Sequence, residues 1–161
     1  MQRRFEHYSA GLTLIELIVA LAILAILASV VLPMAEVTVK RTKEIELKRA
    51  LREVRSAIDA YKADFEEAKL KKKITTSIDE TGYPEEIEVL IEGRDWGGLY
   101  PYKKKYLRRM PRDPFDEYEQ GWGFRSYSDD YDTTTWGGED IYDIYTQSDK
   151  VGLDGTPYNS W

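Results

Sequence analysis

The sequence has no cysteine and a single histidine, His7. Without cysteine, the chain has no disulfide bond, thiolate zinc site, iron–sulfur cluster or cysteine nucleophile. One histidine cannot supply a multi-histidine metal site, and a Ser-His-Asp triad is equally out of reach. Basic residues are in the minority, with 23 Lys and Arg against 29 Asp and Glu and a net charge of −6. The composition therefore argues against an enzyme of these classes and against nucleic acid as the main partner.

The 161 residues predict one domain, but charge and apolar residues are distributed unevenly along it. Residues 40–73 carry 12 basic and 7 acidic side chains, whereas residues 113–161 carry 12 acidic and 2 basic ones. Residues 12–33 read LTLIELIVALAILAILASVVLP and contain only Thr13, Glu16 and Ser29 as polar members. Leu12 to Leu32 is 21 residues, roughly 32 Å as a helix, which matches the hydrocarbon core of a bilayer.

Periodicity predicts the fold class as α+β. Beyond Pro33, apolar residues recur at spacings of four and three and form one stripe of a helix, at Leu47, Leu51, Val54, Ile58, Tyr61 and Phe65. We expect one helix from about Leu12 to Leu70, with Pro33 as its single strained point. Past residue 81 we expect a short helix at 84–92 and strands at 122–127 and 141–146. The long N-terminal helix would pack its second half on this small antiparallel sheet, while its first half spans the membrane.

The N-terminus differs from an ordinary secretory signal, because its apolar run is longer and follows a small residue, Gly11, rather than preceding one. Glu16 is a carboxylate within the predicted span, where an ionisable side chain is costly and usually functional. The alternative is that Glu16 lies at headgroup level, five residues into the run. Both hypotheses remain open from the residues alone.

The segment Ala10-Gly11-Leu12-Thr13-Leu14-Ile15-Glu16 and its apolar continuation resemble the leader junction of type IV pilins and pseudopilins. The resemblance implies that a prepilin peptidase cuts after Gly11 and that the new N-terminal residue, Leu12, is N-methylated. Glu16 would be the fifth residue of the mature chain and would serve assembly. Pro33 would be its twenty-second residue, where the family's helix is often locally melted in the filament. A tolerated kink in a membrane helix is the alternative for Pro33.

Two further segments resemble the major pseudopilin of type II secretion: residues 106–115, YLRRMPRDPF, and residues 140–146, DIYDIYT. The implied organisation is a cleaved leader (1–11), a transmembrane and filament-core helix (12–33) and a periplasmic domain (34–161). The periplasmic domain would comprise an amphipathic helix (34–70), a variable region (71–112) and a small sheet with a C-terminal loop (113–161). The resemblance implies a pilin-like fold.

The resemblance implies a structural, non-enzymatic subunit of a type II secretion pseudopilus. Such a subunit polymerises from the inner membrane into a periplasmic filament that drives protein export across the outer membrane. Its partners would be the prepilin peptidase, copies of itself, minor pseudopilins and an inner-membrane platform protein with its assembly ATPase. One alternative is a type IV pilin in an extracellular fibre for adhesion, motility or DNA uptake. Another is a single-span, membrane-tethered binding domain.

Two polar features of the C-terminal half admit alternatives. Major pseudopilins bind Ca²⁺ through backbone carbonyls and aspartates in the loop after the strand that residues 140–146 resemble. This would assign the Gln147 carbonyl and Asp154 as ligands, with Asp149 as a nearby candidate. The alternative is that they are solvated turn residues. Lys and Arg at 103–105 and 108–109 suggest anion binding in isolation, but a basic face that pairs with the acidic tail of a neighbouring copy is favoured over nucleic acid.

Overall fold

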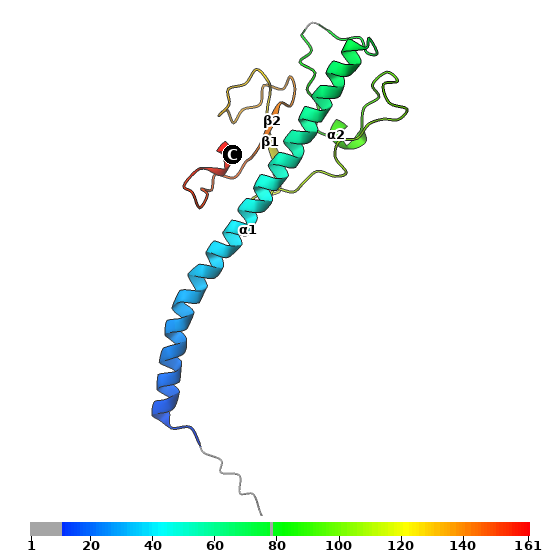
Figure 1. Ribbon diagram of the computed structural model, residues 1–161. Coiled ribbons are helices and arrows are strands. Elements are labelled where there is room, and N and C mark those ends of the chain that lie inside the picture. Colours follow the sequence, from blue (N-terminus) through cyan, green and yellow to red (C-terminus); the bar gives the residue numbers. More distant parts are fainter. Residues whose placement is uncertain (1–10, 78) are drawn as a thin grey trace, which may run out of the picture. The chain divides into compact units, whose positions relative to one another are not determined.

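The computed structural model describes residues 11–77 and 79–161 (Figure 1). In chain order its elements are the helix α1 (Leu14–Leu70), the short helix α2 (Val89–Glu92), strands β1 (Trp122–Arg125) and β2 (Asp143–Thr146), and a 3₁₀ turn, η1 (Tyr158–Ser160). The chain divides into two compact units. The first ends at Lys40, and the second is Arg41–Trp161.

The predicted long helix is confirmed almost to the residue, as α1 begins at Leu14 and ends at Leu70 with Pro33 inside it. Its start is capped by Thr13, whose Oγ1 accepts a hydrogen bond from the Glu16 main-chain N–H at 3.2 Å. Its end is closed by Lys72, which adopts the left-handed conformation, and by the Lys73 N–H, which donates to the Ala68 carbonyl.

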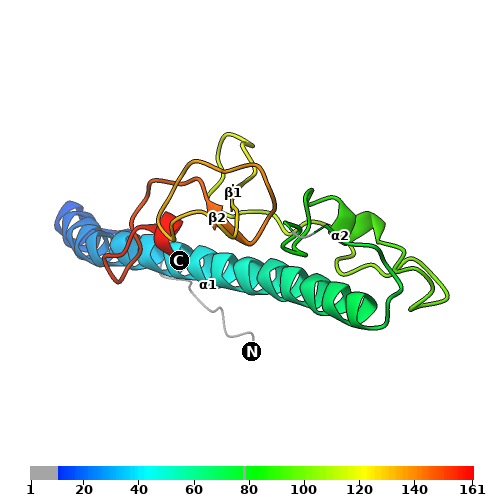
Figure 2. The same ribbon diagram turned by 90° about the horizontal axis from the view of Figure 1, so that it is seen from above.

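The predicted apolar stripe forms the core of the second unit. Each of its six side chains is 2% exposed or less: Leu47, Leu51, Val54, Ile58, Tyr61 and Phe65. Figure 2 shows the sheet and α2 following one another along the same side of this part of α1. The cover is broader than the predicted sheet alone, because Leu90 of α2 and the loop residues Trp96, Leu107 and Phe115 are buried in the same cluster.

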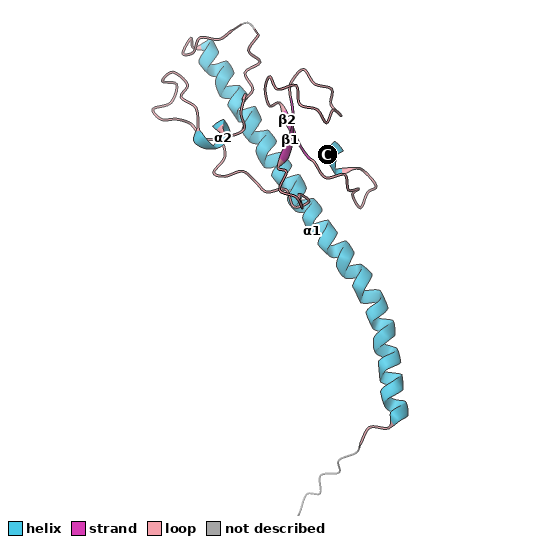
Figure 3. Cartoon of the chain, turned by 180° about the vertical axis from the view of Figure 1, so that it is seen from behind, coloured by secondary structure: helices cyan, strands magenta, loops and turns pink. Residues whose placement is uncertain are grey.

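The two strands pair antiparallel, as predicted, and are shorter than predicted (Figure 3). The strand predicted at 122–127 ends at Arg125, and the strand predicted at 141–146 begins only at Asp143. The residues at these ends form hydrogen bonds outside the β1–β2 pair. The Ser126 N–H donates to the Asp129 carboxylate, and the Ile141 N–H donates to the Pro84 carbonyl.

Gly123 of β1 shows how closely the two strands approach one another's side chains. It lies opposite Tyr145 of β2, and a Cβ built on it would overlap the Tyr145 ring. The glycine is therefore required by close packing.

The helix predicted at 84–92 is reduced to its last turn, Val89–Glu92. The Pro84 carbonyl accepts the hydrogen bond from Ile141, 2.7 Å away, so a tertiary contact takes the acceptor that a helix would need. The Val89 and Leu90 N–H groups bond to carbonyls three residues back, as in a tight turn rather than an α-helix.

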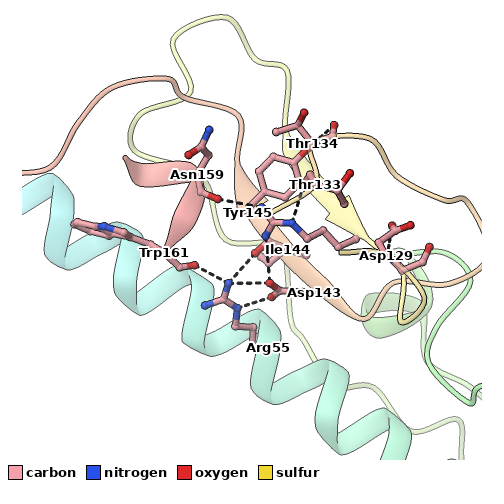
Figure 4. A network of polar contacts seen from close by, with 11 residues as sticks. Arg55, Asp129, Thr133, Thr134, Asp143, Ile144, Tyr145, Asn159 and Trp161 are labelled. Carbon is pink, nitrogen blue, oxygen red and sulfur yellow. Dashed lines mark hydrogen bonds and ion pairs between the residues drawn. The ribbon is translucent and has the colours of Figure 1, made fainter. Parts of the chain in front are cut away.

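Arg55 ties the C-terminal part of the second unit to α1 (Figure 4). The Nε–H group of its guanidinium donates a hydrogen bond to Asp143 Oδ1 at 2.6 Å, and an Nη2–H group donates one to Asp143 Oδ2 at 3.1 Å. The same Nη2 also donates to the main-chain oxygens of Ile144 and Trp161. One planar cation therefore fixes β2 and the segment after η1 against a single turn of α1.

A second polar cluster centres on Asp64, which is 5% exposed and lies on α1. Its Oδ1 accepts hydrogen bonds from Lys104 Nζ and the Tyr100 hydroxyl, both at 2.9 Å, and its Oδ2 accepts one from Tyr106 at 2.5 Å. Burial acts to raise the pKa of Asp64, but these hydrogen bonds together outweigh it and hold the pKa below its ordinary value. The cluster anchors the segment after α2 to the helix.

We expect Asp64→Ala to lower the free energy of unfolding by about 3–5 kcal/mol, because it leaves a partly buried ammonium and two hydroxyls without their acceptor. Glu67→Ala, which removes an exposed ion pair with Lys71, should cost less than about 1 kcal/mol.

Since the pKa of Asp64 is lowered in the folded chain, its contribution to stability is present above roughly pH 4 and lost as pH falls further. Calorimetric melting should show this acid loss in the parent chain and a weaker one in Asp64→Asn. Parallel profiles would contradict it.

Candidate functional site

Of the predicted leader, residues 1–11, the structure describes only Gly11, and the rest of the leader lies outside the described residues. Among residues 11–77 and 79–161, nothing lies within 4 Å of a Cβ built on Gly11. Steric space in the described part of the chain therefore does not require a glycine at this position. A requirement for one would have to come from another molecule that binds the segment.

Glu16 occupies the third helical position of α1 and has two possible roles. Thr13 and Glu16 form the spacing of a capping box, in which a Glu or Gln side chain can support the helix start, and the Thr13 half of that arrangement is present. The Glu16 side chain is exposed and has no ion-pair partner among residues 11–77 and 79–161. Its carboxylate is thus available to a positive group outside the described part of the chain.

The first half of α1 is an uncovered apolar surface. Every described side chain from Leu12 to Val39 is exposed, and α1 contains a stretch long and apolar enough to cross a membrane. Most of the large apolar side chains in this stretch have more than half of their surface exposed, for example Leu14, Ile15, Leu24, Ile26 and Val31. Surfaces of this size on a water-soluble protein mark contact with lipid or protein.

Pro33 interrupts the hydrogen-bond ladder without ending the helix. Because proline has no N–H, the Ser29 carbonyl one turn earlier loses its helical donor. The Ser29 hydroxyl donates to the Ile26 carbonyl at 2.7 Å, and the Thr38 hydroxyl donates to the Met34 carbonyl at 2.8 Å. These side-chain hydrogen bonds flank the weak point within the predicted span, which stays helical in a single subunit.

The three predicted calcium ligands do not share one site. Gln147 and Asp149 line a pocket of about 270 Å³ together with Asp116 and Glu117. The Gln147 side-chain amide donates to the carbonyls of Gln120 and Gly121, 3.3 and 3.2 Å away. Gln147 therefore helps to close the pocket, and its neighbour Lys150 forms an ion pair with Glu117 at the same rim.

Asp154 lines a different pocket, beside Lys48 and Trp161. Its Oδ1 accepts hydrogen bonds from the Thr156 main-chain N–H and hydroxyl, and these contacts lower the pKa of Asp154. This is the geometry of an aspartate that closes its own turn. In the described part of the chain no three acidic side chains gather as a metal site would require, so Ca²⁺ binding stays a prediction.

Sequence reasoning missed the residues that hold the C-terminal loop to the base of the second unit. Glu44 Oε1 accepts hydrogen bonds from the Leu153 N–H at 2.7 Å and the Tyr158 hydroxyl at 2.9 Å. Lys48 places its ammonium 3.9 Å from the centroid of the Trp161 ring. Glu44 and Lys48 are charged and lie outside the apolar pattern of α1, so hydrophobic periodicity could not identify them. The one local signal is that they are spaced i,i+4, as side chains that can pair on a helix surface are.

Comparison with known proteins identifies one feature. Residues 7–32 match the model of the prokaryotic N-terminal methylation motif. Searches of curated proteins and of solved structures give no significant match. The match spans Gly11, Leu12 and Glu16 and the apolar half of α1. The chain thus carries a type IV pilin-like prepilin motif, which implies processing by a prepilin peptidase and polymerisation, on a long helix with a small antiparallel sheet.

Proposed function

We propose that this protein is a structural subunit of a type II secretion pseudopilus, which polymerises from the inner membrane and drives protein export across the outer membrane. The observation that carries the proposal is the methylation motif at the head of a helix whose first half is an uncovered apolar surface. Copies of the chain, packed helix against helix, would bury that surface. The sheet and the loops of the second unit would then face the periplasm.

The chemistry of assembly follows from charges at the start of α1. Cleavage after Gly11 would leave an α-ammonium group on Leu12, and N-methylation preserves its positive charge. In a packed filament the Glu16 carboxylate would be surrounded by apolar side chains, where an unpaired charge is strongly unfavourable. The Leu12 ammonium of a neighbouring copy is the natural partner, and the pair would set the register between successive subunits.

A surface type IV pilin is the principal alternative, since the same motif serves both kinds of filament. The lack of cysteine favours the pseudopilus, because many type IV pilins close a C-terminal loop with a disulfide. The resemblance of residues 106–115 to a pseudopilin segment favours it too. A membrane-tethered binding domain would use the same span but would need neither cleavage nor Glu16. The assembly partners would be the peptidase, minor pseudopilins and an inner-membrane platform with its ATPase.

The first test concerns processing. We expect the mature chain, analysed by mass spectrometry, to begin at Leu12 and to carry one added methyl group. Gly11→Val should block cleavage and leave the unshortened chain, because the fold tolerates a side chain there and only the peptidase excludes it. Ala28→Val, which adds bulk at an exposed position of α1 beyond the junction, is the matched control and should be processed normally. A parent chain that still begins at Met1 would refute the proposal.

The second test separates the two roles of Glu16. Glu16→Gln keeps the capping-box side chain but removes the charge, whereas Thr13→Ala removes the cap but keeps the carboxylate. We expect Glu16→Gln to lose most filaments, since breaking a buried ion pair costs about 3–5 kcal/mol per contact. Thr13→Ala should lose only about 1 kcal/mol of helix stability and still assemble. The reverse ranking in a filament-shearing assay would show that Glu16 serves the helix start alone.

The third test distinguishes secretion from a surface fibre. Deleting the gene should leave folded export substrates in the periplasm, and the Glu16→Gln chain should fail to restore their release. Immunogold labelling of cells at native expression should find filaments in the periplasm. Long fibres outside the cell, together with normal protein export in the deletion strain, would favour the type IV pilin instead.

A further inference from the structure

A groove on the second unit combines arginine and glutamate side chains with the apolar side chains of Ala50, Met110 and Pro111. It lies between α1 and the segment 109–112, has a volume of about 620 Å³, and is lined by Glu46, Arg49, Ala50, Glu53, Arg109, Met110, Pro111 and Arg112. Arg49 and Arg109 are exposed and form no ion pair within the described residues, while Arg112 makes only a 3.6 Å surface contact with Glu119. We call this feature the arginine groove.

The loop between β1 and β2, residues 126–142, presents the complementary chemistry. Tyr131 at its tip is 89% exposed and is flanked by Asp130 and Asp132. No side-chain hydrogen bond or ion pair of either aspartate is found in the part of the chain that the structure describes. The tip therefore presents one exposed aromatic ring between two carboxylates that are open to a cationic partner.

Several hydrogen bonds and a ring contact hold the base of this loop, and the tip with it, in one arrangement. Asp129 Oδ2 accepts hydrogen bonds from the Ser126 and Gly137 N–H groups, at 2.7 and 3.0 Å. Trp136 packs on Phe124 and donates its Nε1–H to the Asp140 carbonyl at 2.7 Å. A tip that is already held in place loses little conformational freedom on docking, which favours binding.

The two surfaces match group by group. The guanidinium groups of Arg49 and Arg109 suit the carboxylates of Asp130 and Asp132, and the apolar side chain of Met110 suits the Tyr131 ring. The tyrosine hydroxyl would donate to Glu46 or Glu53. These acids make the groove a poor site for a polyanion such as nucleic acid or an anionic membrane, so a short segment of mixed character is favoured. The loop of a second copy of this chain supplies one.

We propose that the Asp130-Tyr131-Asp132 tip of one subunit docks in the arginine groove of the next, as a lateral contact of the filament. The proposal rests on the proposed function, because it requires polymerisation. Two different surfaces on each copy make a heterologous contact, which repeats from copy to copy and generates an open helix when it does not close into a ring. Residues outside the membrane-spanning helix would thus help to select the neighbour and its register.

The absence of cysteine gives a clean cross-linking test in the full-length chain. A doubly substituted chain, Arg109→Cys with Asp132→Cys, is assembled and treated with a short bismaleimide, which spans an Arg–Asp contact better than a disulfide, limited to Cα separations of about 4.4–6.8 Å. We expect a ladder of dimers, trimers and higher species. Each single variant should give no ladder, and Arg109→Cys with Asp95→Cys, at an exposed acid on another loop, should give none either.

Charge reversal provides the second measurement. Arg49→Glu with Arg109→Glu, and separately Asp130→Lys with Asp132→Lys, should each lower filament yield about tenfold, and the four changes together should restore it. All four side chains are exposed, so unchanged melting temperatures would show that the fold is intact. Parent filaments should also dissociate more readily at high salt.

The outcomes separate this proposal from the proposed function. If the parent chain forms filaments but the assembled Arg109→Cys, Asp132→Cys chain gives no ladder, or the reversed-charge variants assemble normally, the docking contact is overturned. The proposed function would still stand in that case, because it rests on processing at Gly11 and on the loss of filaments in Glu16→Gln. Dimers from a single-cysteine variant would indicate a symmetric contact and also overturn it. Failure of the parent chain to form any filament would contradict the proposed function itself.

Discussion

Burial of one apolar stripe on α1 is the interaction on which the second unit depends. The stripe from Leu47 to Phe65 organises everything that follows it in the chain, since α2, both strands and the intervening loops all bury side chains against it. The same helix carries an equally apolar surface before residue 40, and no described part of the chain covers it. The hydrophobic effect makes no distinction between the two surfaces, so the second is expected to contact lipid or protein outside the described part of the chain.

Polar ties at the edges of the stripe determine where the weakly structured segments attach. The two strands have four residues each and would be marginal by themselves. Arg55 and Asp64 both lie on α1, and each gathers several partners from segments that are distant in sequence. Apolar burial supplies most of the stability, whereas these directional contacts select one arrangement of loops that contain little regular structure.

Sequence reasoning was accurate where local pattern decides the outcome. The 3.6-residue period placed α1 and its buried face, and the local junction pattern at Gly11, Leu12 and Glu16 falls within the matched methylation motif. It was inaccurate where tertiary contacts decide. In place of the helix expected at 84–92 only its last turn forms, because the Pro84 carbonyl accepts a hydrogen bond from the Ile141 N–H. The calcium ligands expected at Gln147, Asp149 and Asp154 stay a prediction. Neither Arg55 nor the arginine groove has a local signature, because their partners are distant in sequence.

The four tryptophans, at 96, 122, 136 and 161, all belong to the second unit, and the first 40 residues contain none. Tryptophan emission, excited selectively over tyrosine, is therefore an optical probe of this unit and contains no signal from the apolar first half of α1. Trp136, at the base of the loop between β1 and β2 and partly exposed, differs from Trp96, which is almost fully buried. A spectral change on polymerisation would accordingly report on lateral surroundings of the loop, not on melting of the interior.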